Sequence, residues 1–141
     1  MDRNASAVWH GSLKEGKGTL STQSGTLSQT QYSFGSRFET GTGTNPEELI
    51  AAALAGCFTM ALSMQLTSAN MVPDELNTAA VVTMEHTDDG PTVTKIHLTT
   101  TARVPNADKD KFDELATKAK EGCPISRLLK AATITLDARL V

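Results

Sequence analysis

Alternation of β-forming and polar residues with a period of two predicts strands at several places in the 141-residue chain. Residues 6–11 and 18–28 are rich in Thr, Ser and β-forming residues, and glycines break them into short strands and turns. Residues 76–87 and 92–104 alternate on either side of the sequence Asp-Asp-Gly-Pro at 88–91. Two such runs around an Asp-Gly turn predict a β-hairpin.

The same alternation runs through residues 32–40. It predicts an extended segment with Phe34, Ser36 and Phe38 on one face and Arg37 on the other. A flexible stretch of Gly and Thr then leads to the first helix signals.

A long helix is predicted to begin at Asn45, which suits the N-cap, with Pro46 at the first helical position. Glu48 stands at the third position, where its carboxylate can reach back as in a capping box. This assignment gives Glu48 a structural role in the cap and assigns none to Glu47. Residues 49–73 contain no Asp, Glu, Lys or Arg, and we expect the helix to end before the proline that closes this stretch.

The uncharged stretch has the length of a membrane span, which needs roughly 20 strongly apolar residues. No Lys or Arg flanks it. Polar side chains interrupt it at Thr59, Ser63, Gln65, Thr67, Ser68 and Asn70. We therefore predict no membrane partner, but a helix that is buried on most of its sides. A single sheet in so small a chain leaves part of such a helix uncovered, so we expect a homodimer.

The C-terminal third adds two helices and a strand. Residues 107–122 predict an amphipathic helix, whose apolar face holds Phe112, Leu115, Ala116 and Ala119. A short helix is expected next, with Cys123 at or near its N-cap and Pro124 at its first position. Residues 132–141 alternate and predict a closing strand. The pattern indicates one α+β domain over residues 1–141, with antiparallel strands at both ends of the chain.

Composition and charge narrow the function classes. The net charge is −3, and the 13 Lys and Arg residues are scattered, which argues against a nucleic-acid partner. Two cysteines are too few for a secreted disulfide scaffold, and the N-terminus shows no apolar signal segment, so we expect a cytoplasmic location. The histidines lack metal-ligand spacing, and no glycine motif suits a phosphate or a dinucleotide. We predict no metal and no cofactor.

The two cysteines are the candidate reactive groups. Burial of Cys57 in an apolar helix raises the pKa of its thiol, so its reactivity requires a nearby cation. Arg37 is the candidate cation, and the unassigned carboxylate of Glu47 is the candidate partner that orients it. Cys123, at a helix N-terminus, lies where a thiolate is favoured. Each cysteine also has a purely structural interpretation, Cys57 as a small core residue and Cys123 as a helix cap.

Five segments of the chain resemble the OsmC/Ohr family of thiol-dependent peroxidases, and in particular its osmotically inducible protein C branch. They are GKGTLSTQSGTLS, YSFGSRFE, GTNPEELIAAALAGCFTMALS, KAKEGCPIS and ATITLDARL. The resemblance covers essentially the whole chain, and the NPEEL block combined with GCPIS is its most specific part. Gly56 departs from the family pattern, in which alanine is more usual before the cysteine.

The resemblance implies antiparallel sheets wrapped around a central buried helix in an intertwined homodimer. It implies a peroxidase that reduces organic hydroperoxides, with hydrogen peroxide as a further candidate substrate. In the family pattern Cys57 is oxidised to a sulfenic acid, Cys123 resolves it as a disulfide, and a dithiol such as the dihydrolipoyl group of a lipoylated protein reduces that disulfide. Arg37 matches the active-site arginine of the protein C branch, and Glu47 matches its carboxylate partner.

Glu47 and Cys57 lie about 15 Å apart on a straight helix, so they do not touch within one. Either Arg37 bridges them, or the helix bends, or a two-fold axis brings Glu47 of one chain toward Cys57 of the other. We favour the last arrangement, a site shared by two subunits. Two other functions compete with the peroxidase: an apolar-ligand-binding protein with incidental cysteines, and a redox-sensing stress protein with slow peroxide turnover.

Overall fold

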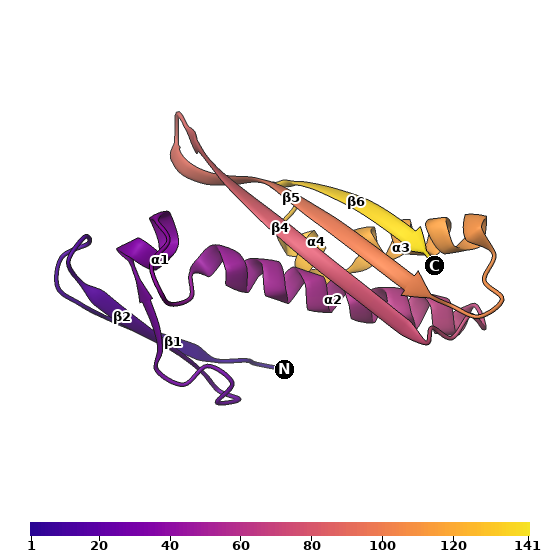
Figure 1. Ribbon diagram of the computed structural model, residues 1–141, viewed down its shortest axis with the longest axis horizontal. Helices are drawn as coiled ribbons and strands as arrows, with labels where there is room; N and C mark the ends of the chain where they lie inside the picture. Colours follow the sequence, from indigo (N-terminus) through magenta and orange to yellow (C-terminus); the bar gives the residue numbers. More distant parts are fainter. The chain divides into compact units, whose positions relative to one another are not determined.

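The computed structural model describes every residue, Met1–Val141. The chain divides into two compact units, Met1–Leu49 and Ile50–Val141. The predicted α+β class is confirmed, because the chain forms two three-stranded sheets together with four helices (Figure 1). That residues 1–141 act as a single domain stays a prediction.

The sheet of the first unit consists of short antiparallel strands in chain order: β1 (Ala5–His10), β2 (Lys17–Thr22) and β3 (Thr30–Ser33). Gly18 on the middle strand pairs with Trp9 on one side and Tyr32 on the other. The two aromatic rings meet there with their centroids 5.3 Å apart. A Cβ atom at Gly18 would lie 2.3 Å from the Tyr32 ring, so the close approach of the rings requires glycine at this position.

Residues 34–38 form the short helix α1 (Phe34–Phe38), so the prediction of an extended segment is wrong here. The cause is a reciprocal capping box. Ser33 Oγ accepts a hydrogen bond from the backbone N–H of Ser36 (3.1 Å), and Ser36 Oγ accepts one from the backbone N–H of Ser33 (2.9 Å). These two local bonds fix the first turn, whereas alternation over so few residues is a weak signal.

The sheet of the second unit has the order β4-β5-β6, with β4 (Glu75–Thr87), β5 (Gly90–Arg103) and β6 (Thr133–Leu140). The predicted hairpin is confirmed: β4 and β5 are antiparallel and joined by a tight turn. Gly90 takes a φ of +97° at this turn, a backbone conformation that favours glycine.

The last strand is parallel to its neighbour, so the prediction of antiparallel strands at both ends of the chain is wrong for β6. A parallel neighbour requires a long crossover connection, which usually contains a helix. The chain between β5 and β6 contains α3 (Lys109–Gly122) and α4 (Pro124–Leu128), and these helices supply the crossover.

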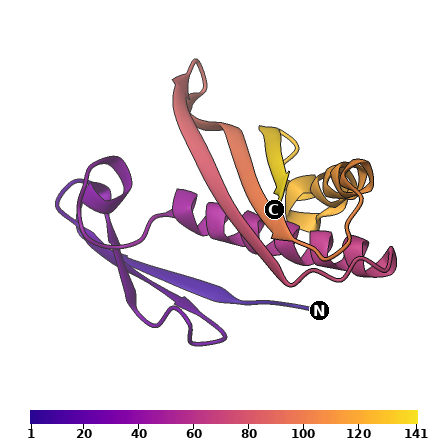
Figure 2. The ribbon, with the colours of Figure 1, turned by 45° about the vertical axis from the view of Figure 1, so that its right-hand side comes forward.

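The core of the second unit lies between this sheet and two helices. In both views, α3 and the long helix α2 (Pro46–Ser68) lie on the same side of the sheet (Figures 1 and 2). The even-numbered residues of β5 from Ile96 to Ala102 point into this core, because side chains alternate along a strand. The fully buried apolar side chains include Phe58 and Leu62 of α2, Ile96 and Leu98 of β5, and Phe112 of α3.

Within the single chain, complete burial of α2 is confined to one stripe. Burial on most sides, which we expect once a second subunit is present, stays a prediction. The buried residues recur every fourth position: Leu54, Phe58, Leu62 and Leu66. Other apolar side chains of α2 lie open, with Met60 76% and Met64 59% exposed. The length and composition of α2 also satisfy the criterion for a membrane span, a test that core helices of water-soluble proteins pass as well.

The start of α2 follows the predicted cap in part. Asn45 Oδ1 accepts a hydrogen bond from the backbone N–H of Glu48 (2.8 Å), and Pro46 opens the helix. The Glu48 carboxylate does not reach back to Asn45 as expected, because it accepts a hydrogen bond from the hydroxyl of Thr44. The helix ends before Pro73, as predicted, and Asn70 adopts a φ of +58° just beyond it.

Candidate active site

The two cysteines lie together in the second unit, although they are far apart in the sequence. Both are free thiols, and they lie close enough for each to shift the pKa of the other. Cys57 is half-buried on α2 and immediately precedes Phe58 of the buried stripe. Cys123 is fully buried at the junction of α3 and α4, where it is the N-cap of α4 and precedes Pro124. The predicted helix-start position of Cys123 is therefore confirmed.

The surroundings act on the two thiols in opposite directions. Burial raises the pKa of Cys57, and the neighbouring Cys123 thiol raises it further, against an opposing contribution from the backbone N–H of Ile125. Burial also opposes ionisation of Cys123, but the neighbouring Cys57 thiol and the backbone N–H groups of Ser126 and Ile125 at the start of α4 outweigh it and hold the pKa of Cys123 below its ordinary value. Of the two sulfurs, Cys123 is therefore the one whose negative charge its surroundings favour.

A surface cavity of about 500 Å³ opens beside Cys57. On α2, Cys57, Met60 and Met64 lie on the same face because they are three to four positions apart. The opposite wall comes from the end of α3 and the start of α4: Lys118, Ala119, Gly122 and Pro124. Most of the lining is apolar, so the cavity suits a hydrocarbon group whose reactive atom points at Cys57.

Arg37 and Glu47 form an ion pair in the first unit. Arg37 Nη2 donates a hydrogen bond to Glu47 Oε1 (2.7 Å), and Arg37 Nε donates to both carboxylate oxygens (3.2 Å each). The predicted contact is therefore present, and it has the fork geometry that fixes the plane of a guanidinium. Helix α1 carries the arginine and the first turn of α2 carries the glutamate. The catalytic roles of both residues stay predictions.

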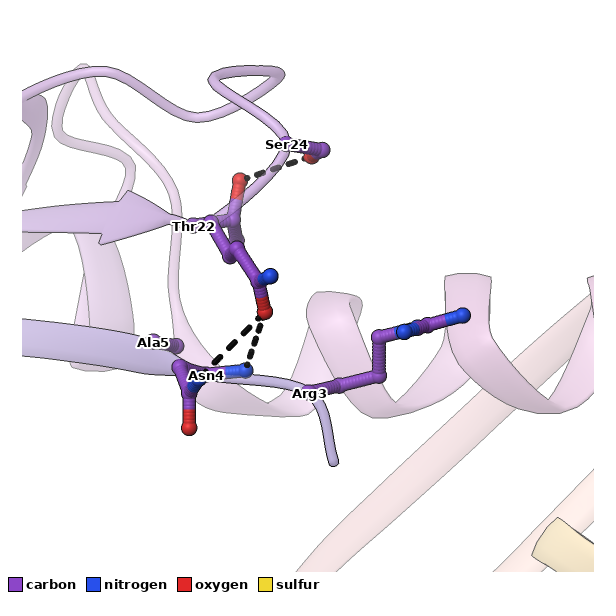
Figure 3. Close-up of a pocket in the computed structure, with 6 residues that line it drawn as sticks. Arg3, Asn4, Ala5, Thr22 and Ser24 are labelled. Carbon is purple, nitrogen blue, oxygen red and sulfur yellow. Dashed lines mark hydrogen bonds between the residues drawn. The ribbon is translucent and has the colours of Figure 1, made fainter. Parts of the chain in front are cut away.

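A second cavity, in the first unit, is lined by none of the thiol, imidazole or carboxylate side chains that usually act as nucleophiles or general bases. It lies between the N-terminal segment and the end of β2, where Gln23 accepts hydrogen bonds from the backbone and the side chain of Asn4 (Figure 3). Arg3 and Ser24 also line it, but the chain places no cysteine, histidine or carboxylate there. No group of three or more His, Cys, Asp or Glu residues in Met1–Val141 is placed to hold a metal ion.

Ile125 and Ser126 are the residues of the site that the sequence analysis did not identify. Both act on the thiols through donors just after the N-cap of α4. The signal for them was present in the sequence, because donors of the first turn point at the N-cap residue of any helix.

Comparisons with known proteins identify the family of the chain. The family of OsmC-like proteins matches residues 39–137. Peroxiredoxin OsmC of Escherichia coli is 49% identical over 99% of this chain and 97% of its own. Organic hydroperoxide resistance protein OhrB of Bacillus subtilis is 36% identical over 70% of this chain and 69% of its own. The solved structure of an OsmC-like protein from Vibrio cholerae covers 98% of this chain and 99% of its own with a TM-score of 0.78 at 16% identity, and thus shares the fold. The chain belongs to the OsmC-like protein family.

Proposed function

We propose that this protein reduces organic hydroperoxides, with Cys57 as the attacking thiol and Cys123 as the resolving thiol. The coarser statement, that it is a peroxide-reducing thiol enzyme, follows from its 49% identity to a peroxiredoxin of the same family over nearly the whole chain. The observation that supports the finer proposal is the contact between Cys57 and Cys123 at the edge of an apolar cavity.

The first step oxidises Cys57. Its thiolate attacks one oxygen of the hydroperoxide, the O–O bond breaks, and the other oxygen leaves as an alcohol after taking up a proton. Cys57 becomes a sulfenic acid. An apolar substituent on the peroxide fits the wall formed by Met60 and Met64, and this favours organic hydroperoxides over hydrogen peroxide.

The second step forms the disulfide. Cys123 attacks the Cys57 sulfur, an S–S bond forms, and water leaves. The two side chains are already in contact in the reduced protein, so this step requires no large movement. A dithiol then reduces the disulfide by exchange, and we propose a dihydrolipoyl group of a lipoylated protein as the donor.

Formation of the Cys57 thiolate needs a positive charge, because burial and Cys123 both raise the pKa of Cys57. We propose that the guanidinium group of Arg37 supplies this charge, since an arginine stays ionised even where it is partly desolvated. The forked hydrogen bonds from Arg37 to Glu47 hold the guanidinium in one orientation, in which its remaining donors can bind the peroxide oxygens as charge develops.

We propose a homodimer in which Arg37 of one chain serves Cys57 of the other. The apolar face of α2 that stays open in the single chain, with Met60 and Met64, supports the dimer. A cytoplasmic location accompanies the proposal, because a reducing compartment supplies the dithiols that the cycle consumes.

The decisive experiment is hydroperoxide consumption in the presence of a dithiol. Cys57→Ser is expected to abolish consumption, whereas Cys123→Ser keeps the first oxidation and loses efficient turnover. Consumption that survives in Cys57→Ser would overturn the proposal and favour a protein that binds apolar ligands.

A further inference from the structure

Ser126 contains the only buried side-chain nitrogen or oxygen atom of residues 1–141 that lacks a hydrogen-bond partner. The residue is 5% exposed and lies at the third position of α4. Its Oγ is sealed from the surface, so bulk water does not satisfy it. A buried hydroxyl without a partner destabilises the state that contains it. This hydroxyl is therefore a candidate for a bond that forms in another state of the protein.

The hydroxyl lies close to Cys123 but makes no hydrogen bond to its sulfur in this structure. Cys123 is the N-cap of α4, and the side chains of the N-cap and of the third helical residue meet at the start of a helix. Ser126 contributes to lowering the pKa of Cys123 through its backbone N–H and through its hydroxyl. A protonated thiol is a weak acceptor, whereas a thiolate is a charged one and attracts donors strongly. The missing partner of Ser126 is thus supplied when Cys123 carries negative charge.

Access to the two sulfurs is unequal. Cys57 lines the open cavity, whereas Cys123 is fully buried. A reductant that enters the cavity meets Cys57 first. In a disulfide exchange at Cys57, the sulfur of Cys123 is the leaving group, and the rate rises as the leaving thiolate becomes more stable.

We propose that the Ser126 hydroxyl stabilises Cys123 as the leaving thiolate when a dithiol reduces the Cys57–Cys123 disulfide, and so directs reduction through Cys57. This inference rests on the proposed function for the existence of that disulfide in the cycle. A thiolate of the reductant attacks Cys57 Sγ, the S–S bond breaks, and its electron pair passes to Cys123 Sγ, where Ser126 donates its hydrogen bond. The second thiol of the reductant then attacks the mixed disulfide, releases Cys57 and closes the reductant's own disulfide. Two protons pass from the reductant to the protein thiols.

The test measures reduction of a preformed disulfide. The full-length protein is oxidised with diamide, mixed with dithiothreitol, and the loss of the disulfide is followed by quenching with an alkylating reagent. Ser126→Ala is expected to slow reduction about tenfold, the effect of losing one hydrogen bond to a charged group. Oxidation of the reduced protein by a hydroperoxide is expected to keep its rate. Equal rates of reduction in Ser126→Ala and in the unaltered protein overturn the inference.

Two further measurements separate this role from a packing role. The variants Ser126→Thr and Ser126→Val have almost the same shape, but only threonine keeps a hydroxyl. Ser126→Thr is expected to be reduced faster than Ser126→Val, and equal rates for the pair overturn the inference. In a Cys57→Ala background, thiolate absorbance is expected to show a higher pKa of Cys123 in Ser126→Ala than with Ser126 present, and an unchanged pKa overturns it.

Because diamide forms the disulfide whether or not the protein consumes hydroperoxides, the role of Ser126 can be tested independently of the proposed peroxidase function. Failure of hydroperoxides to oxidise Cys57 contradicts the proposed function, whereas failure of Ser126→Ala to slow reduction contradicts only the role of Ser126.

Discussion

Cys57 and Cys123 shift each other's pKa in opposite directions: the proximity of their side chains raises the pKa of Cys57 and lowers the pKa of Cys123. The sulfur expected to attack the peroxide is therefore the one whose ionisation its own surroundings oppose. Attack by Cys57 as a thiolate therefore requires a positive charge beside it, and Arg37 is the residue that we propose for this role.

The first prediction concerns the pH dependence of Cys57. Cys123→Ala removes the neighbouring thiol that raises the pKa of Cys57, while the burial of Cys57 remains. The pKa of Cys57 is therefore expected to fall, and alkylation of Cys57 at neutral pH to become faster. Cys123→Ser keeps a hydrogen-bonding group and is expected to show a smaller change. The pH profile of the alkylation rate measures both, and a midpoint that moves to higher pH in Cys123→Ala would contradict the assignment.

The second prediction concerns the fork between Arg37 and Glu47. Arg37→Ala is expected to lower kcat/KM for hydroperoxides about a hundredfold, the typical effect of losing a donor to developing charge. Arg37→Lys keeps the charge without the fork, so we expect a loss of about tenfold. Glu47→Gln is expected to lower activity in the native background and to add little in Arg37→Ala, because the carboxylate acts through the arginine.

The free energy of unfolding is the control measurement for the ion pair of Arg37 and Glu47. Arg37 is 39% exposed, and a pair of this exposure contributes less than about 1 kcal/mol to folding. The exposed pair of Arg103 and Glu75 offers a matched comparison, and Arg103→Ala is expected to leave kcat/KM unchanged. Additive effects of Glu47→Gln and Arg37→Ala would show that the two residues act separately.

The third prediction tests whether two subunits share the site. Arg37→Ala and Cys57→Ser are each expected to be inactive, but a mixture unfolded and refolded together forms hybrid dimers. In a hybrid, the intact Arg37 of one chain meets the intact Cys57 of the other at one of the two sites. Random assembly of equal amounts then restores about one quarter of the native activity, since a two-fold dimer has two equivalent sites. A mixture that stays inactive would indicate that each chain builds its own site.

Much of the fold could be predicted from local signals. The hairpin, the start of α2 at Asn45 and the amphipathic helix α3 follow from turn residues, caps and periodicity, each of which acts within a few residues. The helix α1 was missed, because its capping box of Ser33 and Ser36 competes with an alternating pattern over the same residues. The parallel pairing of β6 was missed because a strand pattern does not specify the direction of its neighbour. The two helices before β6 could have indicated it.

The site was harder to derive than the fold. Local reasoning identified Cys57 and Cys123 as reactive groups and Arg37 and Glu47 as partners, but whether Cys57 and Cys123 meet depends on tertiary packing. The crossover that returns the chain from β5 to β6 places Cys123 at the junction of α3 and α4, in contact with Cys57 on α2. The opposite shifts in the pKa of the two thiols follow from that contact, and no spacing along the sequence encodes them.

The fourth prediction concerns substrate choice. Met60 and Met64 line the cavity beside Cys57, so Met64→Gln replaces apolar wall with an amide of similar length. We expect KM for cumene hydroperoxide to rise by about tenfold, because a pocket contact of this size contributes roughly 1–3 kcal/mol to discrimination. Turnover of hydrogen peroxide, which makes no apolar contact, is expected to stay within about twofold of the native rate. Val72→Gln, an exposed apolar position outside the cavity, provides the control. If Met64→Gln impairs both peroxides equally, the cavity is not where the substrate's hydrocarbon part binds.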